Sequence, residues 1–137
     1  MDRKDLQSLS RIRAREAKAL LDAGLHDGAF YLAGYAVECA LKACIAKKTR
    51  KNEFPDKDRV NKSYTHKLDE LVKLAGIEKP HRALLESDPV FRKHWETVRL
   101  WSEESRYQRP GAHDAEDLVA AIMKRRDGIL SWLRHYW

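Results

Sequence analysis

The sequence predicts an all-α protein, specifically an antiparallel up-and-down bundle of four main helices with a short fifth helix or turn. Long stretches repeat their apolar residues with the 3.6-residue period of a helix, and the ten glycines and prolines lie mostly in a few clusters. No stretch alternates apolar and polar residues as a half-buried strand does. A chain of 137 residues supports one core, so we expect a single domain over residues 1–137.

The first two helices are predicted at residues 5–23 and 27–48, with Gly24 between them as a helix stop. Between residues 29 and 46, only Glu38 and Lys42 are charged. An acid and a base in the middle of this run favour a buried core helix over a membrane span. A stripe of small side chains along this helix lets the first helix or a second copy approach closely. The stripe consists of Ala29, Ala33, Ala36, Ala40 and Ala43.

The remaining elements are shorter or interrupted. Periodicity disappears after Lys47, and we expect a mobile basic loop at about 49–63. A short helix at 66–75, with Thr65 as its cap and His66 only as a first-turn residue, precedes a brief turn near 80–86. Two longer helices are predicted at 89–107 and 114–136. In the last helix, an arginine at 125 or 126 interrupts the apolar side.

Composition excludes several classes of protein. The chain is 43% hydrophobic, which excludes a disordered chain, and its 27 basic and 21 acidic residues give a net charge of +6. No apolar segment follows the charged N-terminus, so we expect no signal peptide, no membrane partner and a cytoplasmic location. Cys39 and Cys44 lie five residues apart and therefore about 140° apart around a helix, so we expect two buried thiols rather than a disulfide.

The common catalytic motifs are absent from the sequence. It contains no glycine-rich phosphate loop, HExxH, CxxC or GxSxG. Its six histidines include no pair at the i, i+4 spacing of helical zinc ligands. We therefore expect neither a metal nor a cofactor.

Arg106 and His113 are the candidate catalytic residues. They flank a predicted Pro-Gly turn, so both side chains could point into one space. A guanidinium binds phosphate oxygens bidentately, and an imidazole transfers protons near neutral pH. Together they suit metal-free RNA cleavage, in which the ribose 2′-OH attacks its own phosphate. In the alternative interpretation, Arg106 only ends a line of alternating charges along the 89–107 helix, and His113 is only a helix-start residue.

Two groups of residues resemble a known family. The run GAFYLAGYAVECALKA at residues 28–43, preceded by REAKALL at 15–21, is similar to the first helical hairpin of the HEPN domain. The segment THKL at 65–68 and the later Trp101, Arg106 and Tyr107 resemble landmarks of that family's third and fourth helices. The similarity extends over nearly the whole chain, and its most specific part is GYAVECALKA.

The resemblance implies a helical bundle that dimerises. In the family, two copies of an arginine-to-histidine motif, with four to six residues between, face each other across the dimer. Active members are metal-independent endoribonucleases, and many are toxins or defence proteins encoded beside a minimal nucleotidyltransferase. The motif corresponds here to Arg106 and His113, with six residues between them.

The same resemblance supports a second function. Active members have a small polar residue after the arginine, where this chain has Tyr107, and the spacer contains Pro110 and Gly111. Relatives that have lost the motif are thought to bind nucleotides or RNA without cutting. In that case Arg106, Tyr107 and Arg109 would hold a phosphate and a base, in a subunit that partners a nucleotidyltransferase. A plain interaction module is the third hypothesis, with the positive charge serving solubility only.

Overall fold

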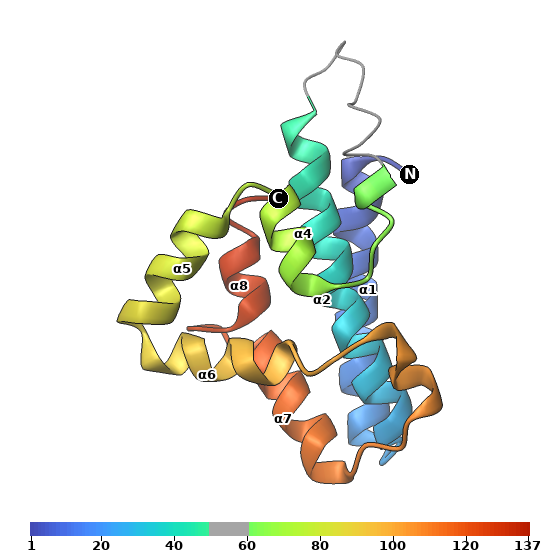
Figure 1. Cartoon of the computed structure of the whole chain (residues 1–137). Helices are drawn as coiled ribbons and strands as arrows, with labels where there is room; N and C mark the ends of the chain where they lie inside the picture. The colour runs from blue at the N-terminus through green and yellow to red at the C-terminus, as the bar shows by residue number, and fades with distance from the viewer. Residues whose placement is uncertain (50–60) are drawn as a thin grey trace.

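The computed structural model describes residues 1–49 and 61–137, and within these ranges every regular element is helical (Figure 1). The predicted all-α class is therefore confirmed. The expected loop at 49–63 falls largely on residues 50–60, which lie outside the described residues; residues 61 and 62 are helical. The elements are α1 (Arg3–Asp22), α2 (His26–Lys48), α4 (Leu68–Leu74), α5 (Glu78–Ser87), α6 (Pro89–Val98), the 3₁₀ helix η1 (Glu103–Tyr107), α7 (Ala112–Met123) and α8 (Ile129–Leu133).

The helices α1 and α2 form a hairpin and lie side by side along the molecule (Figure 1). Asp2 caps α1 in a reciprocal capping box with Asp5, and Gly24 makes the turn with φ 77°. The five alanines of the stripe are buried within the chain, and Ser10 of α1 donates a hydrogen bond to the carbonyl of Ala36 at 2.7 Å. The stripe therefore serves packing inside one chain, and α1, rather than a second copy, lies along α2.

The helix α2 is the core helix that the sequence predicts. It is the one helix among the described residues long and apolar enough to cross a membrane, and 61% of its most apolar stretch is buried inside the structure. A helix buried in a protein core can be as long and as apolar as a membrane-spanning helix. Val37 and Leu41 are fully buried, and Cys44 is nearly so, whereas Phe30 is half-buried. These larger side chains supply bulky packing on α2 in addition to the alanine stripe.

The prediction of one continuous helix at 89–107 is wrong, because α6 ends at Val98 and a separate η1 begins at Glu103. Between them, Trp101 packs against α2, where its indole N–H donates to the carbonyl of Tyr31 at 3.2 Å. Ser102 then starts η1 in a capping box with Ser105. The line of alternating charges predicted on one long helix does not exist, because the chain turns to bring Trp101 into the core.

The expected last helix at 114–136 is also interrupted. The helix α7 ends at Met123, and α8 begins at Ile129 after a turn in which Asp127 has φ 60°. Arg125 and Arg126 lie exposed in this turn. A continuous helix would have placed one of them on the buried side, and the break avoids burying a charge.

In the middle of the chain, two helices differ from the predicted elements in length or in their first residue. The brief turn expected at 80–86 is a ten-residue helix, α5. The helix predicted at 66–75 begins at Leu68, and Thr65 Oγ1 accepts a hydrogen bond from the backbone of Lys67 just before it. In Figure 1, α5, α6 and α8 lie on one side of the α1–α2 hairpin, and the axis of α6 is roughly perpendicular to the hairpin in this view.

Candidate functional site

Arg106 lies in the last turn of η1, and its side chain is 47% exposed. Its Nη1 lies 3.7 Å from Oε1 of Glu103, and its guanidinium carbon lies 4.8 Å from the centre of the Tyr107 ring. Tyr107 and then Glu103 raise the pKa of Arg106, and a side-chain hydrogen bond with Tyr31 acts in the same direction. The group is a cation that is held on one side and open to solvent on the other.

His113 lies in the first turn of α7 and is far more exposed. Its side chain is 86% exposed, and its Nε2 lies 3.5 Å from Oδ2 of Asp117, one turn further along the same helix. Gly111 is the N-cap residue of α7, so the Pro-Gly turn predicted between the two candidates is where α7 begins. His113 is thus available to a ligand or a second molecule.

The structure does not bring Arg106 and His113 together by any contact among the described residues. Each candidate has a carboxylate partner on its own helix: Glu103 for Arg106 and Asp117 for His113. Their joint action on one phosphate stays a prediction.

The two predicted binding residues, Tyr107 and Arg109, are at the surface. The ring of Tyr107 is 79% exposed. Arg109 lines a groove of about 330 Å³ beside the start of α7. Leu100, Asp114 and Asp117 also line this groove. Arg106, Tyr107 and Arg109 thus provide two guanidinium groups and one ring, all exposed at the surface in or just after η1.

Sequence reasoning missed a polar network beneath Arg106. His66 Nδ1 lies 2.5 Å from Oε1 of Glu38, and its Nε2 lies 3.3 Å from Oε2 of Glu103. Glu103 in turn pairs with Arg106 through its other oxygen. We call Glu38, His66, Glu103 and Arg106 the Glu38 network. The available signal was Glu38 itself, since a carboxylate inside an apolar core helix requires a partner from another element.

The expectation that His66 is merely a first-turn residue is wrong. It precedes α4, and its ring connects the core helix α2 with η1. The nearby Tyr35 packs its ring edge-on against both His66 and Trp101, with centroid distances of 6.4 and 5.2 Å. Burial raises the pKa of the Tyr35 hydroxyl, and the hydrogen bond between Tyr35 and Tyr31 adds to this effect. The tyrosine is therefore a neutral packing residue.

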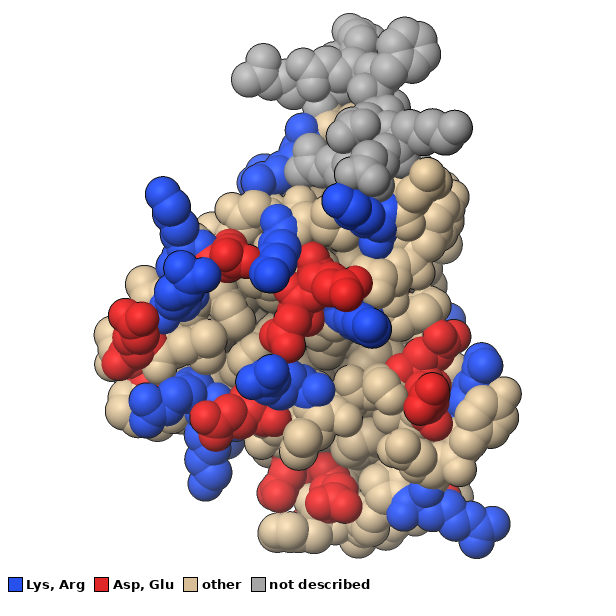
Figure 2. All heavy atoms as spheres, in the orientation of Figure 1, with Lys and Arg blue, Asp and Glu red and all other residues tan. Residues whose placement is uncertain are grey.

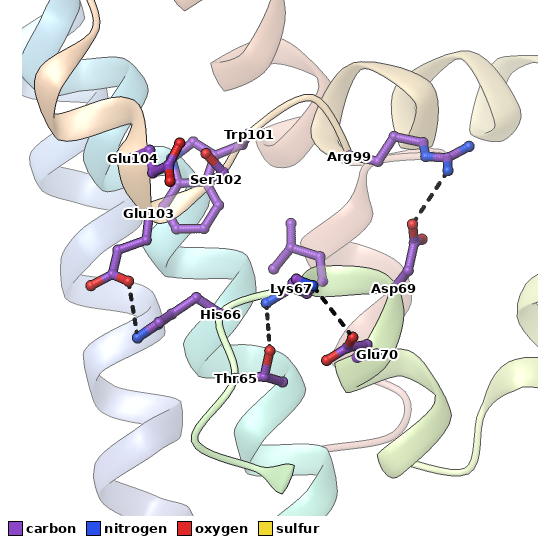
Figure 3. A pocket seen from close by; sticks show the side chains of 11 residues that line it. Thr65, His66, Lys67, Asp69, Glu70, Arg99, Trp101, Ser102, Glu103 and Glu104 are labelled. Atoms are coloured by element: carbon purple, nitrogen blue, oxygen red, sulfur yellow. Dashed lines mark hydrogen bonds and ion pairs between the residues drawn. The ribbon is translucent and has the colours of Figure 1, made fainter.

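A cavity of about 740 Å³ adjoins the network (Figure 3). Its walls come from the segment of Thr65–Glu70 on one side and from Arg99 and Trp101–Glu104 on the other. Figure 3 shows His66 and Glu103 joined across one end of the cavity, and Arg99 and Asp69 paired at the other, where the two groups are 3.4 Å apart. Four carboxylates line the cavity, so it does not suit an anionic phosphate by itself.

Charge is mixed on the face shown in Figure 2, where lysines and arginines alternate with acidic side chains and form no single continuous basic patch. No group of three metal-binding side chains suited to an ion occurs among the described residues. The two ring nitrogens of His66 face different carboxylates, so its contacts do not converge on one point.

A comparison with models of known protein families identifies the family of this chain. A model of the HEPN domain family matches residues 10–136, nearly the whole chain. The fold and this match define a helical protein of a family associated with RNA cleavage or nucleotide binding. The chain belongs to the HEPN domain family, which confirms the resemblance seen in its sequence. Comparisons with curated proteins and with solved structures gave no match.

Proposed function

We propose that the protein is a metal-independent endoribonuclease whose site is completed by a second copy of the chain. The observation that supports this most is the exposure of both motif residues, Arg106 and His113, at the surface of a HEPN chain. Neither is buried in its own chain, and neither contacts the other there. A site that takes Arg106 from one copy and His113 from the other accounts for both facts.

The chemistry requires only these two groups and the RNA. Arg106 binds the scissile phosphate and stabilises the charge that develops on its oxygens. The O2′–P bond forms while the P–O5′ bond breaks, giving a 2′,3′-cyclic phosphate and a 5′-hydroxyl. His113 transfers the proton lost by the 2′-hydroxyl or orients the attacking group, and the departing O5′ takes up a proton.

In this proposal, the second copy packs against the groove beside α7. Leu100 is 79% exposed at its edge, and Arg109 shares the groove with Asp114 and Asp117. In a two-fold dimer the same surface is used twice, so Arg109 of one copy can face the acids of the other. We expect light scattering to give a dimer mass and Leu100→Glu to give a monomer. Val90→Glu, at a position that is 49% exposed on α6, is the matched control and should stay dimeric.

Cleavage is tested with RNA in EDTA. The wild type should release fragments that end in cyclic phosphate, and Arg106→Ala and His113→Ala should each reduce the rate by at least about a hundredfold. His94→Ala is the control, because His94 bonds the carbonyl of Asp127 on another face. Intact RNA with a folded wild-type protein would contradict the proposal.

The second candidate function is nucleotide or RNA binding without cleavage, as a subunit of a minimal nucleotidyltransferase. Tyr107 favours it, because its exposed ring next to Arg106 offers a base-stacking surface. Fluorescence anisotropy with labelled RNA should then show binding that weakens steeply with salt while the RNA stays intact. Tyr107→Ala should weaken this binding. Binding of neither RNA nor a nucleotide would leave the plain interaction module.

The cellular setting belongs to the same proposal. As a toxin or defence component in the cytoplasm, the wild type should slow growth when expressed alone, and Arg106→Ala should not. Co-expression of a minimal nucleotidyltransferase should relieve the growth defect. The nucleotidyltransferase should also co-purify with the protein.

A further inference from the structure

The histidine that the structure connects to Arg106 within one chain is His66, not His113. We propose that His66 is a positioning residue for Arg106 and acts through Glu103, so that the core helix α2 sets the direction of the phosphate-binding guanidinium. This inference rests on the proposed function for its catalytic consequence. The geometric link itself is testable without any activity.

The first step is the fixed position of His66. The side chain of Glu38 is only 5% exposed, and the ammonium group of Lys42 lies 3.8 Å away on the same helix. A buried carboxylate requires close hydrogen-bond donors, and His66 Nδ1 supplies one at 2.5 Å. Tyr35 packs edge-on against the imidazole. The ring is therefore held at one nitrogen and at its edge.

The second step is the hold of His66 on Glu103. The other ring nitrogen, Nε2, lies 3.3 Å from Oε2 of Glu103 in η1. Ionised carboxylates only accept hydrogen bonds, so both contacts of the ring are hydrogen bonds when both nitrogens carry protons. The ring lies between two carboxylates and so links the core to a five-residue 3₁₀ helix.

The third step leads to Arg106. Oε1 of Glu103 lies 3.7 Å from Nη1 of Arg106, and the Tyr107 ring lies against the guanidinium. A guanidinium has five N–H donors, so one carboxylate leaves donors free for a phosphate. Without His66, Glu103 would keep its charge but lose the contact that fixes its oxygens. The guanidinium of Arg106 would then still lie against the Tyr107 ring but would no longer be oriented by a fixed carboxylate.

The competing explanation is that His66 only satisfies Glu38 and stabilises the fold. His66→Gln separates the two roles, because its NH2 group can donate to Glu38 while its other polar atom is a carbonyl oxygen, which cannot donate to Glu103. His94→Gln is the matched control, since His94 is hydrogen-bonded at 2.7 Å to Asp127 on another face. Circular dichroism and thermal unfolding show that each variant folds.

The direct measurement is the ¹H–¹⁵N NMR signal of the Arg106 Nε–H group, assigned by its loss in Arg106→Lys. We expect this signal to shift or broaden in His66→Gln and in Glu103→Gln, and to stay in place in His94→Gln. An unchanged Arg106 signal in folded His66→Gln overturns the proposal. This readout is independent of RNA cleavage, so it distinguishes failure of the link from failure of the proposed function.

RNA cleavage then tests the consequence. His66→Gln should lower kcat about tenfold with KM little changed, as expected when a reacting group is misplaced rather than removed. In the Glu103→Ala background, the same substitution should change kcat less than twofold, because the route through Glu103 is already absent. Equal tenfold losses in both backgrounds would overturn the link. If the wild type does not cleave RNA, the proposed function fails and the NMR result alone decides the inference.

Discussion

The indole of Trp101 occupies the space in which a side chain at Gly34 would lie. A Cβ atom added to Gly34 would lie 2.0 Å from two atoms of the Trp101 ring. Trp101 is 3% exposed, and its N–H bonds the carbonyl of Tyr31. This contact fixes the segment that leads from α6 into η1, and hence the place of Arg106.

Gly34→Ala should therefore destabilise the protein. The ring is held by its hydrogen bond and by the edge-on contact with Tyr35, so the methyl group forces a shift that costs about 1–3 kcal/mol of unfolding free energy. Urea unfolding measures the change. Gly28→Ala is the matched control on the same helix, because its Cβ meets only a flexible methyl group of Leu20 at 3.2 Å. Equal stabilities of the two variants would contradict this account of Trp101.

Acid should destabilise the protein through His81. This residue is 6% exposed, packs 4.4 Å from Trp95 between ring centres, and has an Nε2 with no hydrogen-bond partner among the described residues. Burial lowers the pKa of His81 below its ordinary value of 6.5, although Asp69 and Glu78 oppose the shift. The unfolded chain thus binds a proton more readily than the folded one. Stability is therefore full above pH 6.5 and falls as the pH drops through that value toward the lowered pKa.

Urea unfolding at several pH values between about 5 and 8 checks this prediction for the wild type and for His81→Phe. The phenyl ring keeps the aromatic packing and cannot titrate, so its stability should fall less on acidification. The difference between the two proteins isolates His81 from the other histidines. Identical pH dependence would show that His81 does not contribute.

The buried Cys44 thiol should be unreactive in the folded protein, whereas Cys39, which the sequence also predicted to be buried, is only half-buried. Burial raises the pKa of the Cys44 thiol to about 11 and also raises the pKa of Cys39. The thiolate is the reactive form, so little is present at neutral pH. A colorimetric thiol reagent at pH 7.5 should modify Cys44 slowly before unfolding and both cysteines rapidly in guanidinium chloride. Rapid modification of two thiols in the folded protein would contradict the burial of Cys44.

The sequence predicted the parts of the fold that depend on local pattern. The helices α1 and α2 follow from their 3.6-residue periods, and Gly24 from the need for a positive φ. The breaks after Val98 and Met123 do not follow from local pattern. One serves the contact of Trp101 with Gly34, and the other keeps Arg125 and Arg126 in solvent. The first break depends on a contact between residues far apart in the sequence, and the second depends on which side of the helix would face the core.

The candidate site likewise has residues that the sequence predicted and a residue that it did not. Arg106 and His113 are visible in the sequence because they share a short segment and a family motif. The contribution of His66 is not visible, since it joins Glu38, 28 residues earlier, to Glu103, 37 residues later. Only the charge of Glu38 inside an apolar run indicated that some partner existed.

Mixing two inactive variants tests the central claim most directly. Arg106→Ala and His113→Ala are each incubated with RNA in EDTA, alone and after being mixed and allowed to exchange subunits. If a site combines Arg106 of one copy with His113 of the other, a mixed dimer regains one intact site. We therefore expect two inactive proteins to yield an active mixture with up to about a quarter of the wild-type rate, since half of the dimers are mixed and each has one of its two sites. A mixture as inactive as its components, beside a cleaving wild type, would contradict the claim.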